Sequence, residues 1–242
     1  MVATIWYLYH SGFAVRTAKH FLIFDYWKST PKNAGLEAGV IDPAFLSEDN
    51  VIVFASHRHS DHYNREILSW GQKISKLRLI LSSDIPARAG AVMMEPGQRQ
   101  ILPDISVETF ASNDEGVAFL VHVDGLCIYH AGDLNWWHWE GEPEAYNIGM
   151  EKSYKEQIDH LNGKSVDIAF VPVDPRLEAQ YAWGIDYLMR TADVHNVIPM
   201  HFGRDSSVLE RLLNDPISEK YRDRIVPLKR RGQSTQIGLT QD

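Results

Sequence analysis

The feature that most constrains this chain is an apolar run followed at once by a cluster of metal-binding residue types. Residues 51–56, VIVFAS, have the β-branched and aromatic composition of a buried strand, and residues 57–62 read HRHSDH. Residues 64–72, NREILSWGQ, predict a short helix with Asn64 as its N-cap. The cluster therefore lies where a strand passes into a helix.

Other predicted strands end near residues of the same kind. Residues 4–10, 13–17 and 21–25 predict an antiparallel meander that ends at Asp25. The Asp-Gly pair at 124–125 predicts a hairpin between the strands 116–125 and 126–130, and Asp133 follows it. Residues 153–161 and 184–193 predict helices, and the apolar runs 165–174 and 196–202 predict strands that deliver Asp174 and His201.

Composition places the chain among globular proteins. Hydrophobic residues make up 44% and nothing divides the chain, so we expect one domain over residues 1–242, with two β-layers and helices outside. A net charge of −8 makes a nucleic-acid partner unlikely, despite the basic residues between 222 and 231. Without a membrane-length apolar run or a signal-type segment, we expect a cytoplasmic protein. Cys127 is expected in the core.

The chemistry of the 57–62 cluster points to metal binding. In an extended segment the imidazoles of His57 and His59 point the same way, whereas the adjacent Asp61 and His62 diverge. This spacing suits two neighbouring ions. Imidazole and carboxylate are ligands of zinc and also of iron or manganese, and a catalytic site keeps one position open for water.

The chain resembles the metallo-β-lactamase superfamily. HRHSDH resembles its HxHxDH signature, and HAGD (130–133) and IPMHF (198–202) are similar to its later metal motifs. HSGFAV (10–15) followed by FLIFD (21–25) is similar to the opening of the ascorbate-6-phosphate-lactonase-like branch. The resemblance implies an α/β (α+β) fold, the four-layer αββα sandwich, and a metal-dependent hydrolase with one or two divalent ions, zinc first and manganese or iron as alternatives.

The resemblance also implies roles for particular residues. His57 and His59 would bind the first ion, Asp61 and His62 the second, Asp133 would bridge both, and His201 would complete the second site. Asp25 would orient the histidine loop without binding metal, or would be an ordinary residue at a strand end. As catalytic groups for proton transfer we name Asp61 and His130.

One family ligand is missing. The third histidine of the first site would precede a glycine-marked strand, where residues 112–115 read SNDE. Asp114 is our candidate replacement, and His122 or His130 could fill the gap instead.

Substrate contacts are expected from aromatic and charged residues near the metal motifs. The candidates are His10, Trp136, Trp137, Asp174, Arg176 and Arg204. The favoured function is hydrolysis of a small phosphorylated or lactone/ester-type substrate by metal-activated water. A phosphodiesterase or nuclease of the same fold, or a metal-binding protein without catalysis, are the alternatives. We expect a small-molecule substrate and no membrane partner, and leave a homo-oligomer open.

Overall fold

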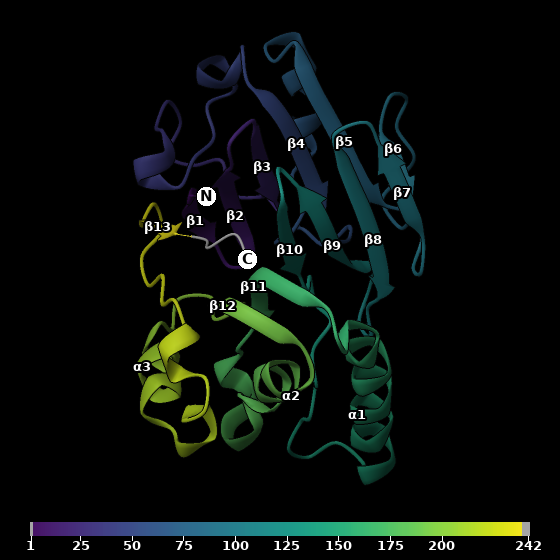
Figure 1. Ribbon diagram of the computed structural model, residues 1–242, viewed down its shortest axis with the longest axis vertical. Helices are drawn as coiled ribbons and strands as arrows, with labels where there is room; N and C mark the ends of the chain where they lie inside the picture. The colour runs from purple at the N-terminus through teal and green to yellow at the C-terminus, as the bar shows by residue number, and fades with distance from the viewer. Residues whose placement is uncertain (1, 239–242) are drawn as a thin grey trace.

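The computed structural model describes residues 2–238 and contains two β-sheets that pack face to face (Figure 1). The first sheet has seven strands, in the order β13 (Ser234–Gly238), β1 (Val2–Tyr9), β2 (Gly12–Arg16), β3 (His20–Phe24), β4 (Asn50–Ala55), β5 (Lys76–Ser82) and β6 (Val92–Met94). The second has six, in the order β12 (Asp193–Met200), β11 (Ser165–Pro172), β10 (Leu126–His130), β9 (Val117–Val123), β8 (Ile105–Ala111) and β7 (Arg99–Leu102).

Both sheets follow one plan, an antiparallel meander that continues into parallel strands. In the first sheet β1, β2 and β3 pair antiparallel, and β3 to β6 pair parallel. In the second sheet β8, β9 and β10 pair antiparallel, and β10, β11 and β12 pair parallel. The carboxyl ends of neighbouring parallel strands share one edge of a sheet, which is where α/β proteins usually bind ligands.

The main core fills the space between the two sheets. Successive residues of a strand face opposite sides. Phe24 on β3 thus packs inward, while Phe21 packs against the outer layer. Phe13 of the first sheet stacks on Phe170 of the second with ring centroids 4.3 Å apart. The aromatic contacts join the sheets directly behind the ends of β3 and β4.

Helices cover the outer faces of both sheets. Figure 1 shows α1 (Glu144–Ile158), α2 (Trp183–Thr191) and α3 (Ser207–Asn214) gathered at one end of the view, and α2 contacts β11 and β12. The outer layer on the first sheet instead consists of the 3-10 helices η1 (Leu36–Ala38), η2 (Pro43–Leu46) and η3 (Arg65–Gln72). Four further 3-10 helices are η4 (Asp159–Leu161), η5 (Pro175–Gln180), η6 (Pro216–Ser218) and η7 (Arg222–Arg224).

The predicted fold class is confirmed, with one difference in helix type. The helix expected after the histidine cluster is η3, and the side chain of Asn64 caps it by accepting a hydrogen bond from the Glu66 amide (3.0 Å). None of the helices in the described part of the chain is long and apolar enough to cross a membrane.

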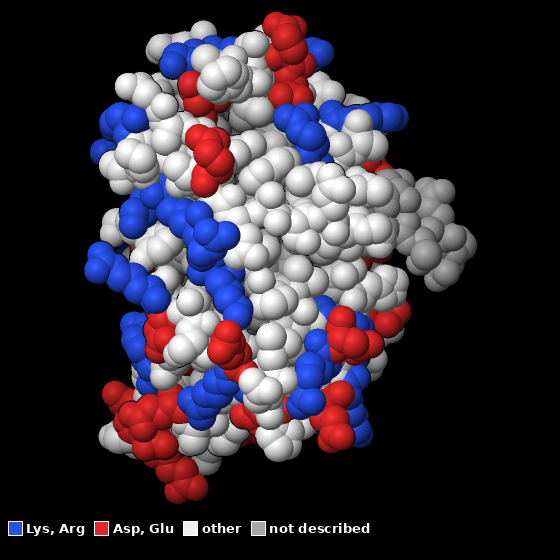
Figure 2. All heavy atoms as spheres, turned by 90° about the vertical axis from the view of Figure 1, so that its left-hand side faces the viewer, with Lys and Arg blue, Asp and Glu red and all other residues white. Residues whose placement is uncertain are grey.

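The basic residues near the C-terminal end of the described chain are largely engaged within the protein. The guanidinium groups of Arg222, Arg224 and Arg231 donate to backbone carbonyls, and Lys229 pairs with Glu210 at 2.7 Å. Figure 2 shows a face on which Lys and Arg are interspersed with Asp and Glu. These residues therefore offer little of the free positive charge that a nucleic-acid surface needs.

Candidate metal centre

The predicted ligands meet where the strand ends of both sheets converge. His57, His59 and His62 follow β4 in the first sheet. Asp133 follows β10 and His201 follows β12 in the second. The donor atoms of His57, His59 and Asp133 lie within 4.8 Å of one another, which makes them one candidate metal group.

A buried hydrogen-bond network fixes the histidines that follow β4. Asp25 is fully buried and accepts hydrogen bonds from the Ser56 amide (2.7 Å), the Ser56 hydroxyl (2.7 Å) and Nδ1 of His62 (2.8 Å). The Ser56 hydroxyl in turn lies 2.9 Å from Nδ1 of His57. Each Nδ1 is therefore occupied by an orienting partner, and each Nε2 faces the centre, as metal-binding imidazoles do.

His201 is oriented in the same way by a residue of the second sheet. Its Nδ1 lies 2.9 Å from Oδ2 of Asp174, whose side chain is buried. We expected Asp174 to contact substrate; the structure places it behind His201, where it fixes the imidazole.

Unpaired polar atoms at the centre test whether these residues fit a metal ion. Nε2 of His57, Nε2 of His62 and Oδ1 of Asp133 are buried without a hydrogen-bond partner among the described residues. Oδ1 of Asp133 lies 3.2 Å from Nε2 of His62 and 3.3 Å from Nε2 of His201. The other carboxylate oxygen, Oδ2, lies 3.4 Å from Nε2 of His57. Two ligand atoms that bind one zinc ion at ~2.0–2.1 Å lie about 3.3–3.4 Å apart at the corners of a tetrahedron. The donor set fits divalent ions, with Asp133 placed between two groups of imidazoles.

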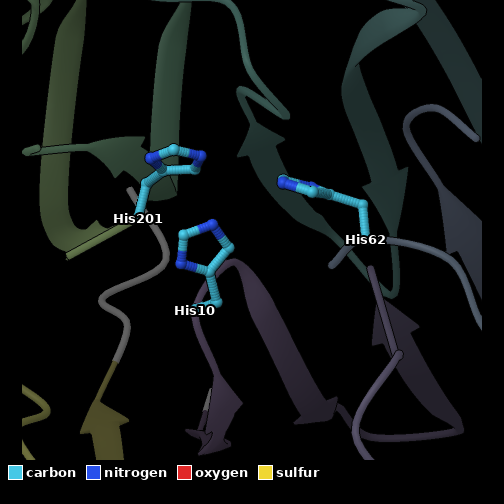
Figure 3. Close-up of side chains that lie close together, drawn as sticks. All are labelled: His10, His62 and His201. Carbon is cyan, nitrogen blue, oxygen red and sulfur yellow. The ribbon is translucent and has the colours of Figure 1, made fainter. Parts of the chain in front are cut away.

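A third histidine joins the second group. Figure 3 shows His10, His62 and His201, whose donor atoms lie within 4.8 Å of one another. His10 comes from the turn after β1, and its ring centroid is 4.1 Å from that of His201. The backbones of His10 (φ 58°) and His201 (φ 64°) adopt left-handed conformations that non-glycine residues rarely take. These backbone conformations direct both side chains into the centre.

Asp61, an expected ligand of the second ion, lies at the edge of the centre and outside the two groups of donors within 4.8 Å of one another. Its side chain is 50% exposed, and its Oδ2 lies 3.6 Å from Nε2 of His10. His10, which we expected near the substrate, stands with His62 and His201, while Asp61 lines the adjoining cavity.

The electrostatics of the centre depend on Asp133 and Asp174. Burial alone would raise the pKa of Asp133, but His62 and His201 hold it far below its usual range. Burial alone would lower the pKa of His201, yet Asp133 and Asp174 raise it to about 10. Burial lowers the pKa of His10 to about 3, assisted by His201 and His62. In the metal-free protein His201 is thus protonated at neutral pH, and His10 is neutral.

These shifts predict how the stability of the metal-free protein depends on pH. Burial lowers the pKa of His57 and His130, so the unfolded chain binds more protons as the pH falls below about 6.5. As the pH falls below that value, each of these two histidines lowers the free energy of unfolding by up to ~1.4 kcal/mol per pH unit. His201 acts oppositely: its contribution is complete below pH ~6.5 and disappears as the pH rises through about 10.

We therefore expect the free energy of unfolding, measured with urea in the presence of a chelator, to peak near pH 6.5. A His130→Asn variant should show a shallower acid limb. A flat profile from pH 5 to 9 would contradict the prediction.

A cavity of about 290 Å³ opens onto the centre. Its lining includes His59, Asp61, Asp133 and His201, together with Asn113, Asp114, Trp137, Trp139, Tyr146, Met150 and Arg176. The two tryptophans stack with their planes 5° apart, and Nε1 of Trp137 donates to the carbonyl of Asp133 (2.8 Å). They form an aromatic wall that is fixed to the Asp133 loop.

Two expected substrate residues lie away from this cavity. Trp136 packs against Trp183 and Tyr187, with Nζ of Lys155 4.2 Å from its ring centroid. Arg204 lies exposed in the turn after His201 and is absent from the cavity lining. Arg176 does line it and is held by Asp174 through Nε and Nη2.

His122, His130 and Cys127 lie outside both groups of donor atoms. His130 is fully buried, stacks on Phe24, and bonds the carbonyl of Ser11 through Nε2 (2.9 Å). This differs from the proton-transfer role that we expected for His130, since a ring so enclosed has no open side toward a substrate. His122 is exposed on β9 beside Cys127, and burial raises the pKa of the Cys127 thiol to about 12.

Three contributors are not among the site residues that the sequence analysis selected. Ser56 bridges Asp25 and His57, Trp139 completes the aromatic wall, and the Glu115 carboxylate lies 3.4 Å from Nε2 of His59. Ser56 directly precedes the HRHSDH motif, and Trp139 belongs to the WWHW run, so their neighbours gave a signal. For Glu115 the available signal was its place in the loop that lacks the family histidine.

Comparisons with known proteins identify the family of the chain. Residues 4–140, more than half of the chain, match the family described as a beta-lactamase superfamily domain, and the chain belongs to this superfamily. No curated protein matched the chain.

Solved structures share the fold at low sequence identity. A metallo hydrolase from the archaeon Ignicoccus hospitalis is 14% identical with a TM-score of 0.66, covering 99% of this chain and 100% of its own. A candidate metal-dependent hydrolase from Parabacteroides distasonis is 15% identical with a TM-score of 0.63, covering 94% and 93%. A diphosphatase of the PhnP family is 12% identical with a TM-score of 0.53, covering 98% of both chains.

Proposed function

We propose that this protein is a metal-dependent hydrolase of a small substrate that carries a phosphate or a similar anionic group. The observation that carries the proposal is the convergence of unpaired, buried Nε2 atoms of His57 and His62 with Oδ1 of Asp133 beside a cavity. Burying such atoms without partners costs free energy, which a bound divalent ion would offset.

The residues of the chain divide the work around that ion. A bound divalent ion supplies Lewis-acid polarisation and generates a nucleophile from water near neutral pH. Nε2 of His57 would bind the first ion, and Nε2 of His62 and of His201 would bind the second. Their Nδ1 atoms are already bonded to Ser56, Asp25 and Asp174. The stacked tryptophans exclude water from one side of the cavity.

Proton transfer falls to the residues at the cavity rim. Asp61 lies half exposed in the cavity, and Nε2 of His10 is buried without a partner 3.6 Å away. The lowered pKa of His10 keeps this imidazole neutral and makes it a weak base, so the Asp61 carboxylate is the member of the pair placed to accept a proton from water.

Arg176 favours an anionic substrate. Its side chain is 64% exposed, and Asp174 fixes its Nε and Nη2, so the remaining donor, Nη1, has no acceptor among the described residues. A fixed guanidinium is well suited to phosphate or carboxylate. A lactone or ester that bears such a group is the second substrate class, and it rests on the resemblance of residues 10–25 to the lactonase-like branch.

The test combines metal analysis of the protein as purified with hydrolysis of phosphomonoesters, phosphodiesters, lactones and thioesters. We expect bound divalent metal and turnover of a small phosphorylated compound. Metal-loaded protein that hydrolyses none of these classes would favour the non-catalytic alternative, and strong, salt-dependent binding of RNA or DNA would favour a nuclease.

Substitution of Arg176 makes the substrate class testable. Arg176→Ala should raise KM for the anionic substrate about 10- to 100-fold, because a hydrogen bond to a charged group contributes ~1.5–3 kcal/mol. The matched control is Arg204→Ala, which removes an exposed arginine outside the cavity and should leave KM unchanged. Equal effects of the two substitutions would remove Arg176 from the substrate site.

A further inference from the structure

Three of the expected ligands surround the proposed first ion. The position of the missing family histidine remains to be filled. His57, His59 and Asp133 form this group. Glu115 brings an additional carboxylate to this group, and its Oε2 lies 3.4 Å from Nε2 of His59. This separation exceeds a good hydrogen bond, at ~2.7–3.2 Å, and it matches the ~3.3–3.4 Å between two ligand atoms on one tetrahedral ion. Glu115 lies outside the group of donors within 4.8 Å of one another, so its carboxylate has to turn toward His57 and Asp133 to share an ion with them.

The backbone brings Glu115 to this position. The next residue, Gly116, has φ +71°, and a Cβ there would lie 2.0 Å from the carbonyl oxygen of Ser56. The Val117 amide donates to that same oxygen (2.9 Å). The loop before β9 therefore lies directly against the segment that carries His57, which fixes where Glu115 can reach.

Arg58 holds the Glu115 carboxylate beside His59. Its Nε donates to Oε2 (3.0 Å) and its Nη2 to Oε1 (2.9 Å), while its own amide donates to Asp84 (2.9 Å). A guanidinium fork of this kind holds the plane of a carboxylate and uses one lone pair of each oxygen. The other lone pair of Oε2 remains available on the side of His59.

Asp114, the replacement that we expected from sequence, is placed less well. It is exposed, and its amide bonds the Ser112 hydroxyl (3.1 Å), which turns the residue within its own loop. Its carboxylate lines the cavity without a described contact to His57 or His59.

We infer that Oε2 of Glu115 is the fourth protein donor to the first ion, in place of the missing histidine, with Arg58 as its positioning residue. The inference rests on the metal centre of the proposed function but not on the reaction. The resulting set has two imidazoles and two carboxylates, which is harder and more negative than a three-histidine set. It favours manganese and iron over zinc relative to that set.

The test is metal binding by stripped protein, measured by calorimetric titration with Mn²⁺ and Zn²⁺ and by the absorption spectrum of the Co²⁺ form. Glu115→Ala should weaken one of the two ions about 100-fold or more and leave the other unchanged. Asp114→Ala is the matched control and should change neither. Glu115→His should restore the weakened ion and shift its preference toward Zn²⁺, and Arg58→Ala should weaken the same ion about 10-fold.

Two outcomes would overturn the inference: unchanged binding of both ions by Glu115→Ala, or an equal loss in Asp114→Ala. Glu115 and Arg58 are partly exposed, so these variants should fold, and thermal unfolding of the stripped proteins checks this. Failure of the proposed function looks different, because the wild-type protein would then bind both ions yet hydrolyse none of the substrate classes.

Discussion

Replacing Asp133 with alanine is expected to lower kcat by about 1,000-fold or more and to lower the metal content. Oδ1 of Asp133 lies between His62 and His201, and Oδ2 faces His57. One carboxylate thus links both groups of imidazoles. Its removal takes a donor from each ion and leaves their separation undefined.

The comparison is with the aromatic wall. Trp137→Ala removes binding surface and one hydrogen bond to the Asp133 carbonyl, so it should raise KM more than it lowers kcat. Metal analysis and steady-state kinetics on both variants decide the matter. A larger loss of kcat in Trp137→Ala than in Asp133→Ala would reverse the roles that we assign.

Replacing Asp25 with alanine is expected to destabilise the metal-free fold by ~3–5 kcal/mol, because it breaks a buried, hydrogen-bonded charge network. Burial would raise the pKa of Asp25, but His130 and His62 hold it below its usual value, so the carboxylate is charged. Without it the Ser56 amide and Nδ1 of His62 lose their partner. Metal affinity should fall as well, since the His62 imidazole is no longer oriented.

Urea unfolding at neutral pH measures this effect, with Asp49→Ala as the control. Asp49 forms an ion pair with Arg16 (2.7 Å) near the surface, where removal of a partner costs ~1 kcal/mol or less. If the two variants lose similar stability, Asp25 is an ordinary residue at a strand end and not the support of the histidine loop.

The sequence predicted the strand ends well because local patterns determine them. The meander at residues 4–25, the hairpin at Asp124 and Gly125, and the apolar strand before His201 all correspond to observed elements. The alternation of apolar and polar residues, the turn residues and the fixed spacing of the motif each involve only a few neighbouring residues. They can therefore be recognised without knowledge of the fold.

Contacts between distant segments could not be predicted in the same way. Trp136 and Trp137 are adjacent, yet one packs toward α2 and the other toward the cavity. Asp114 and Glu115 are adjacent too, yet Asp114 lines the cavity whereas Glu115 pairs with Arg58 beside His59. Such choices are made by packing, which the order of residue types does not reveal.

The donors of the centre come from both sheets: His57 and His62 follow β4, whereas Asp133 follows β10 and His201 follows β12. A bound ion would thus act as a cross-link between segments far apart along the chain, and its binding free energy would add to that of folding. The supply of metal in the cell is then expected to govern the half-life of the polypeptide. Under metal starvation, the stripped chain should be degraded faster, so that the protein itself disappears along with its activity.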